Sequence, residues 1–349
     1  MDQERKRRLF LSCVVLLTSL GLSLIAAEFV TRLFGFRPWH QRGSPNEPIL
    51  MEYDPVLGWK SKEGSFSYRT APEIDPIHIT VVPESRRATE SDETGRLDQR
   101  PKIVLVGGSW TYGWALSDED TLGWKLQKLF KDREVLNYGV AGYGTYQSLL
   151  VLEQQLDKLS DVDIVVYGFL QHHEIRNVAA AEWLRGLSRR GGRGHVATPY
   201  VTLKQHRIQR QPPIRYPSWP GHGDSALIAL IERDWVDLES RRRTRQSHEA
   251  TEQLLLEMKI LTEKHHSHFL VAMFREAAFD LEKHLRYIAF MKEHGIEYVD
   301  CGNVLDDSFR IIGDGHPNGA FNTLWSQQIA PSIENILKRD AVRKHLERS

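Results

Sequence analysis

From residue 102 onward, short apolar runs alternate with longer segments of helical pattern, and this alternation constrains the fold more than any other feature. The apolar runs are residues 103–106, 134–138, 163–169, 269–274 and 297–300. Short runs that are apolar on both faces are typical of parallel strands, which are buried between layers of helices. The sequence therefore predicts an α/β domain in which helices cover a parallel sheet on both sides.

Six segments are predicted to be the helices of this domain. The first begins near the acidic cluster at 117–120, because Ser and Asp suit the N-terminus of a helix. The others are 145–159, 225–245, 247–265, 281–294 and 320–339. In 145–159, Leu149, Leu152 and Leu156 fall on one face, as expected for a helix that packs against a sheet.

The first apolar run ends in Gly107, Gly108 and Ser109, a tight turn that would lift a serine clear of the sheet. The same residues occur where a strand simply leads into a loop. In an open parallel sheet, ligands bind beyond the carboxyl ends of the strands, so the residues at the other ends decide between the two interpretations. Those residues are Gly139 after the second run, His172 and His173 after the third, and Asp314 and His316 before the last helix.

These residue types are the parts of a serine hydrolase. A serine hydroxyl needs a base within hydrogen-bond distance, and the base needs a carboxylate that holds its tautomer. Asp314 and His316 can supply both from one loop, which makes Ser109 the predicted nucleophile. The oxyanion that forms in the reaction needs preorganised donors, and the predicted pair is the backbone N–H groups of Ser109 and Gly139.

The blocks around these residues resemble the SGNH, or GDSL-like, hydrolase superfamily, in the variant with Gly-Gly-Ser in place of Gly-Asp-Ser. The resemblance covers roughly residues 102–338, and the stretch at 53–59 is similar to the lead-in of membrane-anchored members. It implies a flavodoxin-like, three-layer α/β/α sandwich with a five-stranded parallel sheet. It also implies hydrolysis or transfer of acyl groups, commonly acetyl esters on carbohydrate or lipid, without a metal or organic cofactor.

Two positions depart from the family pattern. The third block of the family supplies an asparagine to the oxyanion hole, and His172 occupies that place here, with His173 or Asn177 as alternatives. The spacing Asp-x-His at Asp314 and His316 is one residue shorter than in many members. The shorter spacing occurs in members involved in polysaccharide acetylation, so the predicted triad stands.

Several side chains near the nucleophile are candidates for the walls of a substrate pocket, with packing in the core as the alternative. They are Trp110, Tyr112, His173 and Asn177. A metal site built on His172, His173 and Glu174 is a weaker hypothesis, because no pair has established ligand spacing on one helix. We therefore predict that the chain needs no metal.

The first residues differ in kind from the rest. A basic flank at 5–8 precedes an uncharged apolar run at 9–27, about the length of helix that crosses a bilayer. The third position before a cleavage point at Ala26 or Ala27 holds Leu24 or Ile25 where a signal peptide needs a small residue, so we predict an uncleaved anchor. The N-terminus then lies in the cytoplasm, and the remainder lies outside the inner (plasma) membrane, in the periplasm of a bacterium.

Charge and cysteine content narrow the possible partners. The formal net charge is zero, yet residues 175–245 hold fourteen Lys and Arg against six Asp and Glu. This segment is predicted to be an insertion whose charge is more commonly explained by a solvated loop, with contact to an anionic polymer or lipid headgroups as the alternative. Nucleic acid is not expected outside the cytoplasm. Cys13 lies in the apolar run, so Cys301 has no partner for an intrachain disulfide.

The predicted organisation is an anchor at 1–35, an extended lead-in with short β segments at 36–101, and a hydrolase domain at 102–340. The predicted function is a serine esterase that acts on an O-acylated, commonly acetylated, glycan or lipid through an acyl-Ser109 intermediate. One alternative is an acyltransferase that works with the assembly machinery of an envelope or exported polysaccharide. The other is a catalytically weakened scaffold that binds glycan. The substrate class rests on the family resemblance and on the anchor.

Overall fold

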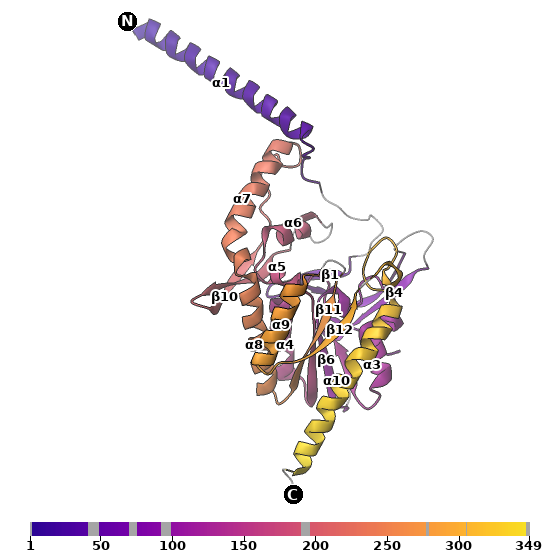
Figure 1. Cartoon of the computed structure of the whole chain (residues 1–349). Helices are drawn as coiled ribbons and strands as arrows, with labels where there is room; N and C mark the ends of the chain where they lie inside the picture. Colours follow the sequence, from indigo (N-terminus) through magenta and orange to yellow (C-terminus); the bar gives the residue numbers. More distant parts are fainter. Residues whose placement is uncertain are drawn as a thin grey trace.

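The computed structural model of the chain describes residues 2–40, 49–69, 75–91, 99–189, 196–276, 279–304 and 306–346. Its centre is a sheet whose parallel part has five strands, with helices on both faces (Figure 1). The parallel strands are β6 (Lys102–Gly107), β7 (Glu134–Asn137), β8 (Val162–Phe169), β11 (His268–Arg275) and β12 (Glu297–Val304). They coincide with the five apolar runs of the sequence, so the structure confirms the predicted α/β fold.

The order of the parallel strands across the sheet is β7-β6-β8-β11-β12. The strands that follow β6 in the chain therefore lie on its two opposite sides. A ligand is expected to bind outside the carboxyl ends of the strands at such a reversal. Ser109 follows β6 and His172 follows β8, so the topology places both at this reversal.

Alternation along each strand divides the side chains between two helical layers. Ile103 and Leu105 of β6 pack with helices on one face, and Val104 and Val106 pack with helices on the other. The first layer holds α3 (Leu122–Leu129) and α10 (Gly319–Leu346). The second holds α4 (Thr145–Gln155), α8 (Ser247–Lys264) and α9 (Leu281–Glu293). This is the three-layer α/β/α arrangement, and the two layers lie on either side of the sheet in Figure 1.

The segment before β6 contributes to the same sheet. Its first two strands, β1 (Met51–Asp54) and β2 (Gly58–Ser61), form a separate hairpin. The next three, β3 (Gly64–Tyr68), β4 (Ile77–Val82) and β5 (Arg86–Arg87), are antiparallel and extend the sheet to eight strands. They join it through the pair Arg87 and Asn137. The sequence indicated short β segments here, but their pairing with a sheet formed by later residues is a tertiary effect.

The insertion between β8 and α8 holds more structure than the one predicted helix. It contains α5 (His173–Asn177), α6 (Ala181–Arg189), a hairpin of β9 (Thr198–Lys204) and β10 (Arg207–Ile214), and α7 (Ala226–Arg245). Residues 190–195 lie outside the described part. The hairpin was not predicted because no residue of β10 is buried, so the strand lacks an apolar alternation that a sequence pattern could detect.

The N-terminal segment is one continuous helix, α1 (Asp2–Leu33), which is longer than the predicted run at 9–27. Among the described residues, this is the one helix long and apolar enough to cross a membrane, and a signal sequence would meet the same criteria of length and composition. Its last turns contact the beginning of α7. The carboxylate of Glu28 accepts hydrogen bonds from the backbone N–H groups of Ala226 and Leu227, at 2.9 Å each.

Candidate active site

Ser109, His316 and Asp314 form one hydrogen-bonded chain. His316 Nε2 lies 3.0 Å from Ser109 Oγ, and His316 Nδ1 is hydrogen-bonded to Asp314 Oδ1. A carboxylate only accepts, so the proton of the neutral imidazole sits on Nδ1 and the lone pair of Nε2 faces the hydroxyl. The three predicted residues are therefore brought together in the geometry with which an imidazole can remove a proton from a serine.

The turn after β6 places the nucleophile at the start of a short helix, α2 (Ser109–Tyr112), with Gly108 as its N-cap. Gly107 has a φ of +155°, and a Cβ on it would lie 2.2 Å from Thr111 Oγ1. A Cβ on Gly108 would lie 2.9 Å from His173 Nε2 and 3.1 Å from Arg176 Nη1. Both glycines are thus required because other side chains pack directly against the turn.

The loop that carries Asp314 is held by several contacts. Its Oδ1 accepts a hydrogen bond from the His316 N–H at 3.2 Å, and its Oδ2 accepts one from Trp114 Nε1 at 3.1 Å. Burial opposes ionisation of this carboxyl group, but the hydrogen bonds and the charge of His316 outweigh burial and lower the pKa of Asp314. Asp314 therefore stays ionised. A group that orients an imidazole and stabilises its protonated form must carry this negative charge.

The predicted oxyanion donors differ in their availability. The Ser109 N–H belongs to the first residue of α2, and no acceptor for it is found among the described residues. The Gly139 N–H donates to Asn137 Oδ1 at 3.0 Å, so the Asn137 amide must turn away before Gly139 can donate to a substrate. A Cβ on Gly139 would lie 2.7 Å from Tyr112 N, so the glycine is required by the packing of α2.

His172 does not fit the predicted role of a neutral oxyanion donor. Its Nδ1 lies 2.6 Å from Glu276 Oε1, and its Nε2 is buried with no hydrogen-bond partner among the described residues. Burial, reinforced by the charge of Arg176, lowers the pKa of His172 to about 4. The ring is thus neutral near pH 7, with its proton on the nitrogen that faces Glu276. Nε2 then presents a lone pair, which cannot stabilise an oxyanion.

The other residues predicted for the substrate pocket are buried by packing. The ring of Trp110 stacks on Trp325 with centroids 5.2 Å apart, and Tyr112 lies under Arg87 in the opposite core. Because α2 lies between the two cores of the sandwich, one of these aromatic side chains enters each core. The sequence pattern could not distinguish a pocket wall from this packing.

His173 and Asn177 are also buried, and both hold α5 in place. His173 Nδ1 lies 2.7 Å from Tyr167 Oη. The Asn177 side chain accepts a hydrogen bond from the Tyr146 N–H at 3.0 Å and donates to Thr145 and Thr251. With every polar atom of its amide engaged, Asn177 secures the start of α4 and cannot fill the place of the family's asparagine.

The chain is similar to solved structures of G-D-S-L family proteins. One from Desulfitobacterium hafniense DCB-2 has 13% identity and a TM-score of 0.41, and the match covers 66% of this chain and 99% of that one. A lipolytic G-D-S-L family protein from Veillonella parvula DSM 2008 has 10% identity and a TM-score of 0.39, covering 66% and 96%. A psychrotrophic esterase from Pseudoalteromonas sp. has 9% identity and a TM-score of 0.37, covering 68% and 98%.

No family model and no curated protein matches the chain. The assignment of a function therefore rests on the residues of the site itself.

Two residues of the site were not found from the sequence pattern. Trp114 lies shortly after the nucleophile in the sequence, but its hydrogen bond to Asp314 joins residues far apart in the chain. Glu276 directly follows β11, and the rule that strand ends carry function could have indicated it. Both act through contacts between distant segments, which no local motif records.

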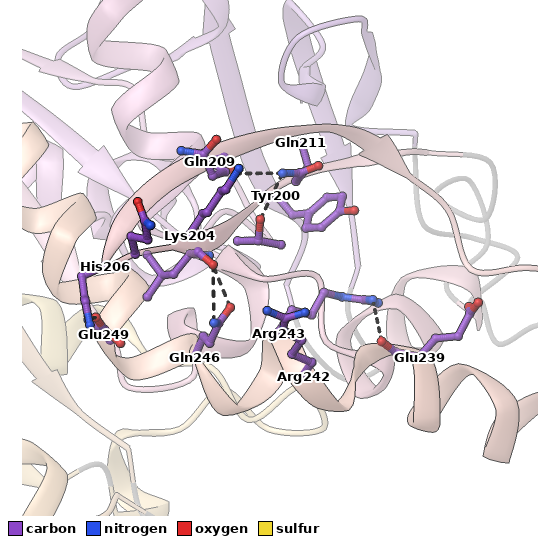
Figure 2. A pocket seen from close by; sticks show the side chains of 13 residues that line it. Tyr200, Lys204, His206, Gln209, Gln211, Glu239, Arg242, Arg243, Gln246 and Glu249 are labelled. Carbon is purple, nitrogen blue, oxygen red and sulfur yellow. Dashed lines mark hydrogen bonds and ion pairs between the residues drawn. The ribbon is translucent and has the colours of Figure 1, made fainter.

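A groove of about 770 Å³ lies in the insertion, and its lining includes none of the triad residues. Figure 2 shows its side chains on the β9–β10 hairpin and on the corner between α7 and α8. It is lined by polar and basic groups, among them Lys204, Gln209, Gln211 and Arg242. Within the described ranges, no cluster of three or more His, Cys, Asp or Glu is arranged to hold a metal ion.

Proposed function

We propose that this protein is a serine esterase of SGNH type, with Ser109 as nucleophile, His316 as base and then acid, and Asp314 as the residue that orients His316. The single observation that carries the proposal is the hydrogen-bonded chain of these three side chains, with His316 Nε2 at 3.0 Å from Ser109 Oγ. Three residues that are separated by up to 207 positions meet with the correct nitrogen facing each partner. Packing alone gives no reason for this arrangement.

The proposed reaction has two steps. Ser109 Oγ attacks the carbonyl carbon of the ester while its proton passes to His316 Nε2, and the oxyanion is bound by the Ser109 N–H. His316 then gives that proton to the leaving alcohol, and an acyl-Ser109 ester remains. Water attacks this ester with His316 as base, which releases the carboxylic acid and restores the serine. The ionised Asp314 stabilises the imidazolium in both steps.

The proposed substrate is an O-acylated glycan or lipid outside the inner membrane. Support comes from α1, which begins with a basic flank and is long and apolar enough to serve as an anchor. The similarity of residues 53–59 to the lead-in of membrane-anchored members is consistent with this location. The anchor would restrict the enzyme to substrates at or near the outer surface of that membrane.

The nucleophile is tested with the full chain in detergent and p-nitrophenyl acetate as substrate. We expect Ser109→Ala to reduce turnover by about 10⁴- to 10⁶-fold and to abolish labelling by a fluorophosphonate. Ser117→Ala is the control, since Ser117 precedes a turn of 3-10 helix and contacts none of the triad residues. Equal rates for wild type and Ser109→Ala would overturn the proposal.

The substrate class is tested by mass spectrometry of an O-acetylated glycan incubated with the wild type and with Ser109→Ala. Loss of acetyl groups with the wild type alone supports the esterase. Gain of acetyl groups from an added acyl donor would keep the acyl-Ser109 step and assign the second step to a sugar hydroxyl in place of water. An unchanged glycan beside normal turnover of p-nitrophenyl acetate would exclude this substrate class.

A further inference from the structure

The outward face of α7 carries an apolar stripe. Ile231, Trp235 and Leu238 are 49%, 50% and 57% exposed, and their spacing of four and three residues aligns them along the helix. The opposite face of α7 buries Glu232 and Val236 against the domain, so the stripe is separate from the core. Large apolar side chains that line up on the surface of a helix mark an interaction surface.

Basic side chains continue the same face of α7. Arg242 and Arg245 follow Leu238 at helical spacing, and both are exposed. Exposed Lys204 and Arg207 lie on the neighbouring hairpin, and Lys204 lines the same groove as Arg242 (Figure 2). None of these four cations has an ion-pair partner among the described residues. The one exposed acid between the stripe and these arginines is Glu239, so the end of the stripe is positively charged.

The beginning of α7 is tied to the end of α1. Glu28 directly follows the apolar run at 9–27 and binds the first N–H groups of α7. Arg32 Nη2 also donates to the Asp224 carbonyl oxygen at 2.8 Å, and the Trp39 ring stacks on His222 with centroids 5.0 Å apart. The first turn of α7 therefore lies where α1 would leave a bilayer. Figure 1 shows α7 beginning beside the end of α1 and turning away from its direction.

We propose that α7 is an interfacial helix that lies on the membrane surface next to the anchor, with anionic lipid as its partner. The stripe of Ile231, Trp235 and Leu238 enters the boundary between headgroups and acyl chains, where tryptophan is favoured. Arg242 and Arg245 then contact the anionic headgroups. The inference rests on the proposed anchoring by α1, and it gives the catalytic domain a second contact that fixes its orientation relative to the membrane.

The experiment uses the full chain in vesicles of phosphatidylglycerol and phosphatidylcholine in equal amounts, with or without lipid brominated near the headgroup. The chain has nine tryptophans, so the emission of Trp235 is isolated as the difference between wild type and Trp235→Phe. We expect brominated lipid to remove more than about half of that difference emission, because an interfacial side chain lies within reach of bromine. Trp124→Phe is the control, since Trp124 lies on α3, which packs on the opposite face of the sheet from α8 and α9.

Charge is tested in the same vesicles. We expect stronger quenching of Trp235 by brominated phosphatidylglycerol than by brominated phosphatidylcholine, and the replacement of Arg242 and Arg245 by glutamine removes this preference. Equal quenching by the two lipids with the wild type would overturn the assignment of an anionic partner.

Three results would overturn the inference. The first is difference emission from Trp235 that brominated lipid does not change, and the second is release of the full chain from vesicles by alkaline carbonate. The third is disulfide-linked dimers of Leu238→Cys, made in a Cys13→Ser chain, which would assign the stripe to a second copy. Turnover of p-nitrophenyl acetate is measured in parallel. If the wild type shows no turnover, that result counts against the proposed esterase alone, because no α7 residue belongs to the catalytic site.

Discussion

Two histidine–carboxylate pairs lie at the same edge of the sheet, and their difference defines the site. In His316 and Asp314, the imidazole nitrogen that faces away from the carboxylate meets Ser109 Oγ. In His172 and Glu276, the corresponding nitrogen is buried and meets no hydrogen-bond partner among the described residues. A histidine beside a carboxylate is thus insufficient for catalysis. The imidazole can act as a base only when a nucleophile lies within hydrogen-bond distance of its other nitrogen.

The largest difference in turnover is expected between variants of the two carboxylates. Asp314→Asn should reduce turnover of p-nitrophenyl acetate by about 10⁴-fold, because an amide no longer holds the His316 tautomer or stabilises its protonated form. Glu276→Gln should reduce it by less than about tenfold, since a glutamine oxygen still accepts from His172 Nδ1. Comparable losses in the two variants, with unchanged melting temperatures, would contradict the assignment.

The second prediction concerns His172 itself. His172→Ala should lower kcat by less than about tenfold, whereas removal of an oxyanion donor costs about 10²- to 10³-fold. The reason is that burial lowers the pKa of His172 to about 4 and leaves Nε2 as an acceptor. A loss in the higher range would show that His172 adopts the other tautomer in the transition state and donates, as the family resemblance implies.

The third prediction removes one support of the catalytic pair. Trp114→Phe deletes the hydrogen bond to Asp314 Oδ2 and should lower kcat by about threefold to tenfold, the net contribution of a typical hydrogen bond. The pKa of Asp314 should also rise towards its ordinary value, because the indole N–H no longer stabilises the carboxylate. An unchanged kcat would mean that Trp114 only covers the loop.

The smallest effect is expected at a third pair, which is structural. The hydrogen bonds of His248 to Glu174 and Glu252 raise the pKa of His248 to about 9. The folded-state pKa exceeds the unfolded value, so the stabilisation is fully present below about pH 6.5 and is lost as the pH rises through about 9. His248→Gln should lower the melting temperature by about 2–4 °C at pH 6 and by less at pH 9.5.

The control for this measurement is His78→Gln, because His78 is exposed on β4. Turnover should be unchanged in both variants, since neither histidine contacts Ser109 or His316. A pH-independent loss of stability in His248→Gln would mean that packing, and not the charge on the ring, holds α8 to α5.

Much of the fold could be predicted because periodicity is local. Each apolar run from 103 to 300 became a parallel strand, and the segment at 225–245 became α7. What could not be predicted depends on partners elsewhere in the chain. In the β9–β10 hairpin, β10 has no buried residue, and β3 to β5 join the parallel strands through the pairing of β5 with β7.

Part of the candidate site could likewise be predicted from the sequence. Ser109, Asp314 and His316 are recognisable because each stands in a short motif at a strand or helix end. The burial of Trp110, Tyr112 and Asn177 could not be predicted, because a side chain's direction is set by packing against distant residues. Asn177, for example, is engaged by Thr145, Tyr146 and Thr251, none of which is near it in sequence.

The five parallel strands, the apolar N-terminal run and three residues able to perform acyl chemistry can be recognised from the order of residues alone. This is possible because alternation, helix spacing and a glycine turn are properties of neighbouring residues. Folding establishes which histidine faces the serine, that the Gly139 N–H is engaged by Asn137, and that His172 carries its proton on the side of Glu276. These features depend on burial and on hydrogen-bond partners from separate segments, and both exist only once the chain has folded.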